Sequence, residues 1–266
     1  MTAARFLSLA AALLLAVTPL LAAPHAKKAA ETETALFIGN SYTFVNDLPA
    51  VVAAMAKAGK CPLQCESYTE GATALIQFWE EPKHARARQL VQGGGYAYVI
   101  LQDQSMTPCT NPPWTLNFGG KWAELAKKHH AKPVFFLTWA HLAPDGKTFD
   151  SGMQDELSAT YRRVAQEHDA LVAPVGEAWR RWYNRHPDMP LHVADGSHPN
   201  ALGTYLAGCV FYRVLCGKSP VGLPCRLRDG RRTLLAVPAD KAKECQQLAD
   251  SVVKAEKKRA AATEEE

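Results

Sequence analysis

Hydrophobic and polar positions alternate between two kinds of segment along most of this chain. Short apolar or β-branched runs bounded by turn residues predict strands at about 34–39, 64–69, 96–102, 133–138 and 170–173. Longer stretches with helical apolar spacing predict helices at about 48–58, 74–92, 114–130, 153–168, 176–185 and 200–215. Because parallel strands need crossover helices, and right-handed crossovers cover both faces, the pattern predicts an α/β fold: a three-layer α/β/α sandwich around a parallel sheet.

The two ends of the chain differ from this alternating region. Arg5 precedes an almost uncharged apolar run, 6–23, which ends in small residues and is typical of a signal peptide. A retained membrane anchor is the alternative, since about 20 apolar residues can span a bilayer. We therefore expect a signal peptide at 1–23, a polar leader at 24–33, a domain at 34–218, and a C-terminal extension at 219–266 with a charged helix and an acidic tail. The protein is then expected to be secreted or periplasmic.

Composition narrows the range of partners. The 266 residues are 47% hydrophobic and 21% charged, as in an ordinary globular protein. Net charge is +4, but the 30 Lys and Arg are scattered among 26 Asp and Glu without a basic stripe, which argues against nucleic acid. We expect no cofactor, no metal, and no membrane association once the signal peptide is cleaved. The sequence does not indicate an oligomeric state.

Seven cysteines bear on the same question of compartment. In an exported chain they predict up to three disulfides and one remaining thiol, with the pairing left open. Cys209, inside an apolar helical stretch, is the best candidate for a simple core residue. The cysteines are Cys61, Cys65, Cys109, Cys209, Cys216, Cys225 and Cys245.

The first candidate for chemistry is Ser41. An apolar strand ends at Gly39, so Ser41 falls just past its carboxyl end, where open α/β sheets bind ligands. At such a turn the hydroxyl is presented at the sheet edge, beside backbone N–H groups that can hold an oxyanion. Capping of the following helix is the alternative role for this serine.

A second candidate pair lies in the loop before the helix at 200–215. Asp195 and His198 are three residues apart, close enough for the carboxylate to reach the imidazole. An imidazole can accept the serine proton near neutral pH, and a bonded aspartate fixes its tautomer. With Ser41 these residues would complete a catalytic triad. Taken alone, they could also be surface turn residues, since Asp-Gly is a common turn dipeptide.

These blocks resemble a known family. Gly-Asn-Ser-Tyr-Thr at 39–43 is similar to the Gly-Asp-Ser-Leu block of the SGNH/GDSL hydrolases in its Gly-Asn-Ser-x-Thr variant, and Asp-Gly-Ser-His at 195–198 matches the closing Asp-x-x-His block. The resemblance spans about 35–216. It implies a flavodoxin-like α/β/α fold, ester hydrolysis without a metal, and an oxyanion hole made by the nucleophile's amide, a glycine amide and an amide side chain.

The resemblance also assigns the oxyanion hole. Ser41 supplies the first amide, and Gly71, after the second strand, lies where the family's glycine is expected. The third block departs from the family pattern, because Gln-Asp-Gln at 102–104 replaces Gly-x-Asn-Asp. Gln102, at the strand end, is our preferred donor, whereas position-by-position matching gives Gln104.

Three further residues are candidates for the substrate cleft. His141 follows the fourth strand and either lines the cleft or is unused in a loop. Trp139 and Trp114 lie in or next to loops on the same side, where an indole face can contact a sugar ring, although tryptophans more commonly pack in the core.

The sequence therefore predicts a secreted serine esterase acting on a small-molecule or glycan ester, with short acyl groups favoured because no long apolar lid is present. One alternative is a secreted carbohydrate-binding protein of the same fold without turnover. The other is a lipase or thioesterase of that fold.

Overall fold

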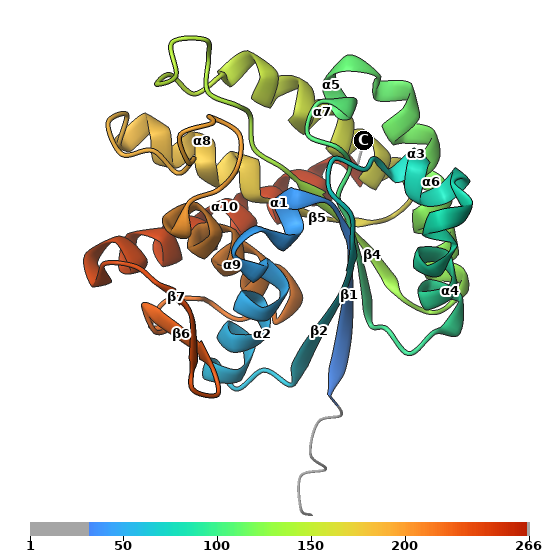
Figure 1. The fold of residues 1–266 in the computed structure, drawn as a ribbon, viewed down its shortest axis with the longest axis horizontal. Coiled ribbons are helices and arrows are strands. Elements are labelled where there is room, and N and C mark those ends of the chain that lie inside the picture. The colour runs from blue at the N-terminus through green and yellow to red at the C-terminus, as the bar shows by residue number, and fades with distance from the viewer. Residues whose placement is uncertain (1–31, 265–266) are drawn as a thin grey trace, which may run out of the picture. The chain divides into compact units, whose positions relative to one another are not determined.

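Five parallel strands form the central sheet of the computed structural model, which describes residues 32–264 (Figure 1). Their order across the sheet is β2-β1-β3-β4-β5. Apart from the edge strand β2, the strands consist largely of apolar residues, and those of β1, β3 and β4 are almost wholly buried, as expected where helices cover both faces. The strands are β1 (Glu33–Gly39), β2 (Leu63–Thr69), β3 (Tyr98–Leu101), β4 (Lys132–Leu137) and β5 (Leu171–Pro174).

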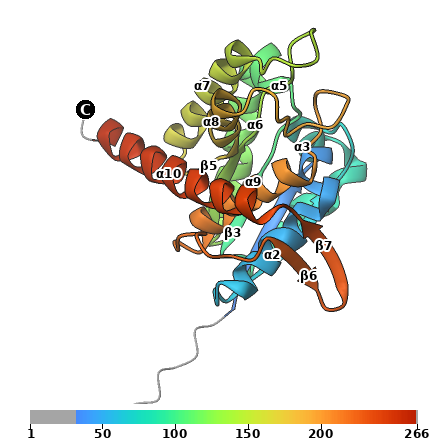
Figure 2. The same cartoon turned by 90° about the vertical axis from the view of Figure 1, so that its left-hand side faces the viewer.

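Helices lie on both faces of this sheet, which confirms the predicted α/β/α sandwich. One layer contains α2, α9 and α10, and the other contains α4, α6 and α7 (Figures 1 and 2). The helices are α1 (Ser41–Phe44), α2 (Leu48–Ala58), α3 (Leu75–Glu80), α4 (Ala85–Gly93), α5 (Thr107–Thr110), α6 (Pro112–Lys128), α7 (Ser151–Glu167), α8 (Val175–Arg185), α9 (Ala201–Leu215) and α10 (Ala239–Glu264). Of the helices in the described part of the chain, none is long and apolar enough to cross a bilayer.

Two predicted helices differ from the structure in detail. The helix expected at 74–92 is divided into α3 and α4, because Pro82 cannot continue a helix and its ring restricts Glu81, which is extended at φ −76° and ψ 126°. The helix expected at 114–130 begins at Pro112 and is preceded by the short α5. Both differences follow from local proline chemistry and leave the layers unchanged.

The segment 219–264 packs onto the domain rather than extending from it. It contains an antiparallel hairpin, β6 (Arg226–Asp229) and β7 (Arg232–Ala236), followed by α10. The helix α10 lies along α9, where Arg213 donates to Asp250 at 2.9 Å, and Arg162 on α7 forms a two-bond ion pair with Glu256. The signal peptide expected at 1–23 and all but the last residues of the leader expected at 24–33 lie outside the described residues.

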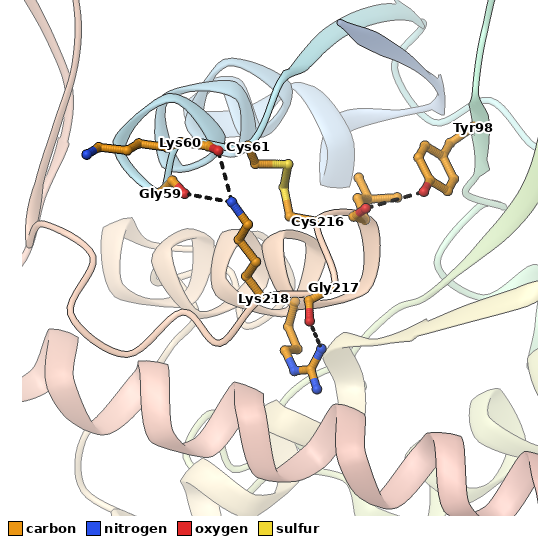
Figure 3. Close-up of a disulfide and its surroundings, with 9 residues drawn as sticks. Gly59, Lys60, Cys61, Tyr98, Cys216, Gly217 and Lys218 are labelled. Atoms are coloured by element: carbon orange, nitrogen blue, oxygen red, sulfur yellow. Dashed lines mark hydrogen bonds between the residues drawn. A yellow bond between two sulfur atoms is a disulfide. The ribbon is translucent and has the colours of Figure 1, made fainter. Parts of the chain in front are cut away.

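The cysteines form fewer disulfides than the three that the count allows. Cys61 is bonded to Cys216 (Figure 3), and the other five are free. The helix α5, which carries Cys109, contacts α6 and α7, and neither of these helices contains a cysteine. The strand β2, which carries Cys65, contacts β1 and α2, and these elements contain no cysteine either. Cys209 is fully buried in α9, as expected for a core residue.

Candidate active site

The carboxyl edge of the sheet brings together the loops that carry the predicted site residues. Ser41 begins α1 directly after Asn40, which follows β1. The loop at 70–74 follows β2 on one side of β1, and the loop at 102–106 follows β3 on the other side. Since parallel strands end at the same edge, all three loops surround Ser41.

The structure brings Ser41, His198 and Asp195 into one hydrogen-bonded chain. The Ser41 Oγ lies 2.8 Å from Nε2 of His198, and Nδ1 of the same ring lies 2.8 Å from Oδ2 of Asp195. A proton on Nδ1 satisfies Asp195 and leaves Nε2 free to accept from the serine hydroxyl. This is the arrangement in which an imidazole can remove the serine proton.

The surroundings of Asp195 keep its carboxylate ionised. Partial burial disfavours the charge, but the backbone N–H groups of Ser197 and His198 donate to Oδ1 at 2.8 and 2.9 Å, and the imidazole donates to Oδ2. Together these donors outweigh burial and lower the pKa of Asp195 from 3.8 to about 2. The group therefore remains an anion that can stabilise an imidazolium at neutral pH.

The turn that presents Ser41 is held by buried amide side chains. Oδ1 of Asn40 accepts from the Tyr42 N–H at 3.2 Å, and Nδ2 donates to the carbonyl of Thr73 at 3.1 Å. The preceding Gly39 cannot carry a side chain here, because a Cβ atom would lie 2.5 Å from Oε1 of Gln102. The strand end, the serine turn and the loop after β2 are thus locked together.

Gln102 belongs to this scaffold. Its side chain is fully buried, and its Oε1 accepts from the Asn40 N–H at 2.7 Å and from Oγ1 of Thr43 at 3.0 Å. Its Nε2 donates to Oδ1 of Asn40 and to the carbonyl of Asp103. Both amide hydrogens are therefore used inside the protein, and neither is left for a substrate.

Three other donor groups at this edge each retain an N–H hydrogen for a ligand. Among residues 32–264, no acceptor is bonded to the backbone N–H of Ser41 or of Gly71. Oε1 of Gln104 accepts from the N–H groups of Met106 and Thr107, at the start of α5, while its Nε2 has a single partner, Oγ of Ser105 at 3.3 Å. Gln104 therefore retains an amide hydrogen that a ligand could use.

A second polar chain, which we did not predict, adjoins the first. The hydroxyl of Tyr42 lies 2.7 Å from Oγ of Ser197, and that oxygen lies 3.2 Å from Nε2 of His141. Burial lowers the pKa of His141, which favours the neutral ring in this chain. His141 thus contacts the loop that carries Asp195 and His198, where the sequence left its role open.

The two tryptophans considered as sugar platforms have different positions. Trp139 is buried between the rings of Tyr42 and Trp179, and its Nε1 donates to the Ser197 carbonyl at 2.9 Å, so its face is not available to a ligand. Trp114, at the start of α6, is 49% exposed. Only Trp114 of this pair can offer an aromatic surface to solvent.

Within the described residues, no group of three or more His, Cys, Asp or Glu side chains is arranged to hold a metal ion. The oxygen and nitrogen atoms that converge near Ser41 are instead suited to proton transfer and to holding a negatively charged oxygen.

No protein-family model matches the sequence, and no curated protein matches it significantly. Several solved structures do resemble the fold. A protein from Slackia heliotrinireducens proposed to be an SGNH hydrolase aligns with a TM-score of 0.60 at 23% identity, covering 69% of this chain and 98% of its own. The lipase/acylhydrolase from Enterococcus faecalis aligns with a TM-score of 0.55 at 12% identity, covering 70% and 96%.

Axe2, an acetylxylan esterase from Geobacillus stearothermophilus, aligns with a TM-score of 0.54 at 13% identity, covering 69% of this chain and 94% of its own. At these identities the likeness concerns the path of the backbone. It confirms the resemblance noted from the blocks around Ser41 and His198 at the level of architecture: the described chain has the fold of the SGNH/GDSL hydrolases.

Proposed function

We propose that this protein is a serine esterase in which Ser41 is the nucleophile, His198 the general base and Asp195 the residue that orients the base. The observation that carries the proposal is the continuous chain of two 2.8 Å contacts from Ser41 through His198 to Asp195. The shared fold of solved lipases and esterases supports the same reaction class.

In the first half of the proposed reaction, Nε2 of His198 takes the Ser41 proton as Oγ attacks the ester carbonyl. The imidazolium that forms is stabilised by the ionised Asp195. Collapse of the tetrahedral intermediate expels the alcohol, which receives the proton from Nε2, and leaves an acyl group on Ser41. Water then repeats the sequence: His198 deprotonates it, the carboxylic acid is released, and the Ser41 hydroxyl is restored.

The negatively charged oxygen of each tetrahedral intermediate needs donors that are already in position. We propose the N–H groups of Ser41 and Gly71 together with Nε2 of Gln104. Gln104 is preferred over Gln102 because Gln102 donates both of its amide hydrogens to acceptors inside the protein, on Asn40 and Asp103. This reverses the preference that we drew from the strand end.

The substrate that we propose is a short-chain ester, carried by a carbohydrate. The exposed face of Trp114 and the likeness to an acetylxylan esterase support this choice. Lipase or thioesterase activity would instead require room for a long acyl chain. A series of p-nitrophenyl esters from acetate to palmitate separates these possibilities, with the rate expected to be highest for acetate and to fall as the chain lengthens.

The catalytic claim is tested by labelling and turnover together. A fluorophosphonate should modify Ser41, and hydrolysis of p-nitrophenyl acetate should be lost in Ser41→Ala. The matched control is Ser219→Ala, which changes an exposed serine in the loop that follows α9. Asp195→Asn, which removes the charge but keeps the shape, should lower kcat by about 10⁴-fold. Well-folded wild-type protein that neither reacts with the probe nor hydrolyses any ester would refute the proposal.

We also propose that the protein is exported. The apolar run at 6–23 and the pairing of Cys61 with Cys216 support this, because disulfides persist in oxidising compartments. The test is the N-terminal sequence of the protein recovered from the culture medium or periplasm. An N-terminus near residue 24 is expected, whereas retention of residues 1–23 on cytoplasmic protein would contradict export.

A further inference from the structure

A groove of about 460 Å³ adjoins the proposed oxyanion site, and its walls come from three elements. The helix α3 forms one side, and the loop after β3 with α5 and the first turn of α6 forms the other. Figure 1 shows the positions of α3, α5 and α6 in the fold. The volume falls in the range of about 300–1,000 Å³ that is usual for small-molecule sites. The residues that matter for its chemistry are Gln77, Glu80, Glu81, Gln104 and Trp114.

The groove is lined in part by Ala74 and Gln104, which belong to two of the loops that surround Ser41. Ala74 lines it and directly follows Thr73, whose carbonyl accepts from Nδ2 of Asn40, the residue before Ser41. Gln104, the proposed oxyanion donor, lines the groove as well. An ester whose carbonyl oxygen reached Gln104 could therefore place one of its two substituents in this groove.

A single buried carboxylate fixes the three walls. Asp103 accepts from the Leu75 N–H at 2.9 Å, from the Gln104 N–H at 2.8 Å, and from Oγ1 of Thr115 at 2.6 Å. These bonds hold the start of α3, the loop after β3 and the first turn of α6. Burial raises the pKa of Asp103, and the three donors oppose that shift. Because Thr115 is the neighbour of Trp114, these bonds fix the backbone from which the indole projects.

The surface of the groove suits a sugar ring. Trp114 is 49% exposed, so a large part of its indole is open to a ligand. Its flat face can pack against the C–H groups of a pyranose. Gln77 and Gln104 each keep one amide hydrogen beyond the one donated inside the protein, and the carboxylates of Glu80 and Glu81 can accept from hydroxyl groups around that ring.

The charged side chains that line the groove are both acidic. Glu80 and Glu81 both line it, and among the described residues that line it none is Lys, Arg or His. Each glutamate has a lysine nearby, Lys121 at 3.9 Å from Glu80 and Lys83 at 3.0 Å from Glu81, but neither lysine lines the groove. A carboxylate or phosphate on the ligand would therefore approach the two glutamates more closely than either lysine.

We propose that this groove binds the sugar that carries the ester, stacked on Trp114, and that Glu80 and Glu81 select uncharged rings over uronates. The inference rests on the proposed esterase function and adds to it the place where the sugar binds and its preference for an uncharged ring. The groove would hold the leaving group during attack by Ser41, so that binding energy from the ring positions the ester carbonyl near Gln104.

The test compares substrates that share an acyl group and differ in the alcohol. Kinetics are measured on p-nitrophenyl acetate, an acetylated methyl xyloside and an acetylated methyl glucuronoside. Trp114→Ala should lower kcat/KM for the xyloside about tenfold more than for p-nitrophenyl acetate, chiefly through KM. Trp114→Phe, which keeps an aromatic face, should recover most of that loss. Equal losses on the two substrates would overturn the stacking role.

The proposed selection against charged rings is tested by a separate double variant. Wild-type protein should prefer the xyloside to the glucuronoside, and Glu80→Gln with Glu81→Gln should reduce that preference roughly fivefold, the effect of a charge pair near the surface. An unchanged preference would overturn the selection. If wild-type protein hydrolysed no ester, including p-nitrophenyl acetate, the proposed function itself would fail. Activity on p-nitrophenyl acetate without any effect of Trp114 would refute only the groove.

Discussion

Asn46 donates from Nδ2 to the carbonyl of Pro199 at 3.1 Å, which joins the segment after the nucleophile to the residue that follows His198. The same nitrogen lies 2.9 Å from Oγ1 of Thr204 on α9. Asn46 has a φ of +55°, a conformation that asparagine tolerates better than most residues. Asn46, which is not part of the proposed triad, thus links the segment after Ser41 to the loop that carries His198.

We expect Asn46→Asp to weaken this link while keeping the shape and the backbone tolerance. Aspartate cannot donate to the Pro199 carbonyl, so the free energy of unfolding should fall by about 1–3 kcal/mol, and the distance between Ser41 and His198 should become less well fixed. The measurable result is a lower kcat on p-nitrophenyl acetate with little change in KM.

The control is Asn117→Asp, which makes the same chemical change at an exposed position of α6. If Asn46→Asp kept the full fluorophosphonate labelling rate of Ser41 and full kcat, the link between Asn46 and Pro199 would have no part in positioning the base.

The proposed oxyanion donor can be tested by a substitution that keeps its structural bonds. Gln104→Glu retains the oxygen that accepts from Met106 and Thr107 at the start of α5, but it lacks the amide hydrogens. We expect kcat to fall by about 10²–10³-fold, which corresponds to about 3–4 kcal/mol of lost transition-state stabilisation. KM should change little, because the lost bond forms mainly in the transition state.

Gln102→Glu provides the contrast. This change removes donors to Asn40 and Asp103 inside the scaffold, so its main effect should be a lower free energy of unfolding. Full activity in Gln104→Glu would exclude Gln104 as a donor and return the assignment to a backbone group.

The sequence predicted the layers of the fold and the residues that meet at its carboxyl edge, because both follow from local patterns. Apolar runs at strand spacing predicted the sheet, and Ser41 and His198 each belong to a short block with a recognisable pattern. The choice between Gln102 and Gln104 could not be made this way. It depends on which of the two side chains points into the core after β3. Gln102 does so because Asn40 and Thr43 donate hydrogen bonds to its Oε1.

The break between α3 and α4 and the hairpin β6–β7 both have signals in the sequence that our prediction did not use. Pro82 inside the stretch 74–92 is a sufficient reason to divide the helix there. Gly230-Arg231, between Arg-Leu-Arg-Asp and Arg-Thr-Leu-Leu, is the two-residue turn of the hairpin β6–β7, and a glycine at its first position is a hairpin signal. The disulfide had no such signal, since the pairing of Cys61 with Cys216 depends on the direction in which α9 crosses the sheet.

His192 should make stability depend on pH. Its ring is buried against Trp179, with Nδ1 2.7 Å from the Tyr183 hydroxyl and Nε2 3.0 Å from the Ala140 carbonyl. Burial lowers the pKa of His192 from 6.5 to about 4, despite the opposing bond to Ala140. The unfolded chain therefore binds more protons between these values, and the contribution of His192 to stability is complete above pH 6.5 and lost as pH falls toward 4.

The comparison that isolates this group is the wild type against His192→Asn, unfolded by urea at several pH values. The difference in free energy of unfolding should be largest above pH 6.5 and should shrink by up to about 3 kcal/mol by pH 4. A difference that stays constant across this range would show that His192 has an ordinary pKa in the folded protein.

The disulfide joins the far ends of the two helices that begin at the proposed site. Cys61 follows α2, whose first turn lies close after Ser41, and Cys216 follows α9, which begins three residues after His198. Near the bond, Nζ of Lys218 donates to the carbonyls of Gly59 and Lys60 at 3.3 and 2.9 Å (Figure 3). The bond closes a loop of 155 residues, for which the chain-entropy relation gives about 5 kcal/mol.

We therefore expect Cys61→Ser with Cys216→Ser to lower the free energy of unfolding by about 2–5 kcal/mol, while kcat on p-nitrophenyl acetate stays close to the wild-type value because Asn46 still holds the near ends of α2 and α9. Dithiothreitol should bring the wild type to the stability of the double variant and leave that variant unchanged. Cys65→Ser, which removes a free thiol on β2, is the control and should keep the response to dithiothreitol. A wild type that is insensitive to dithiothreitol would mean that Cys61 and Cys216 are not bonded in the folded protein.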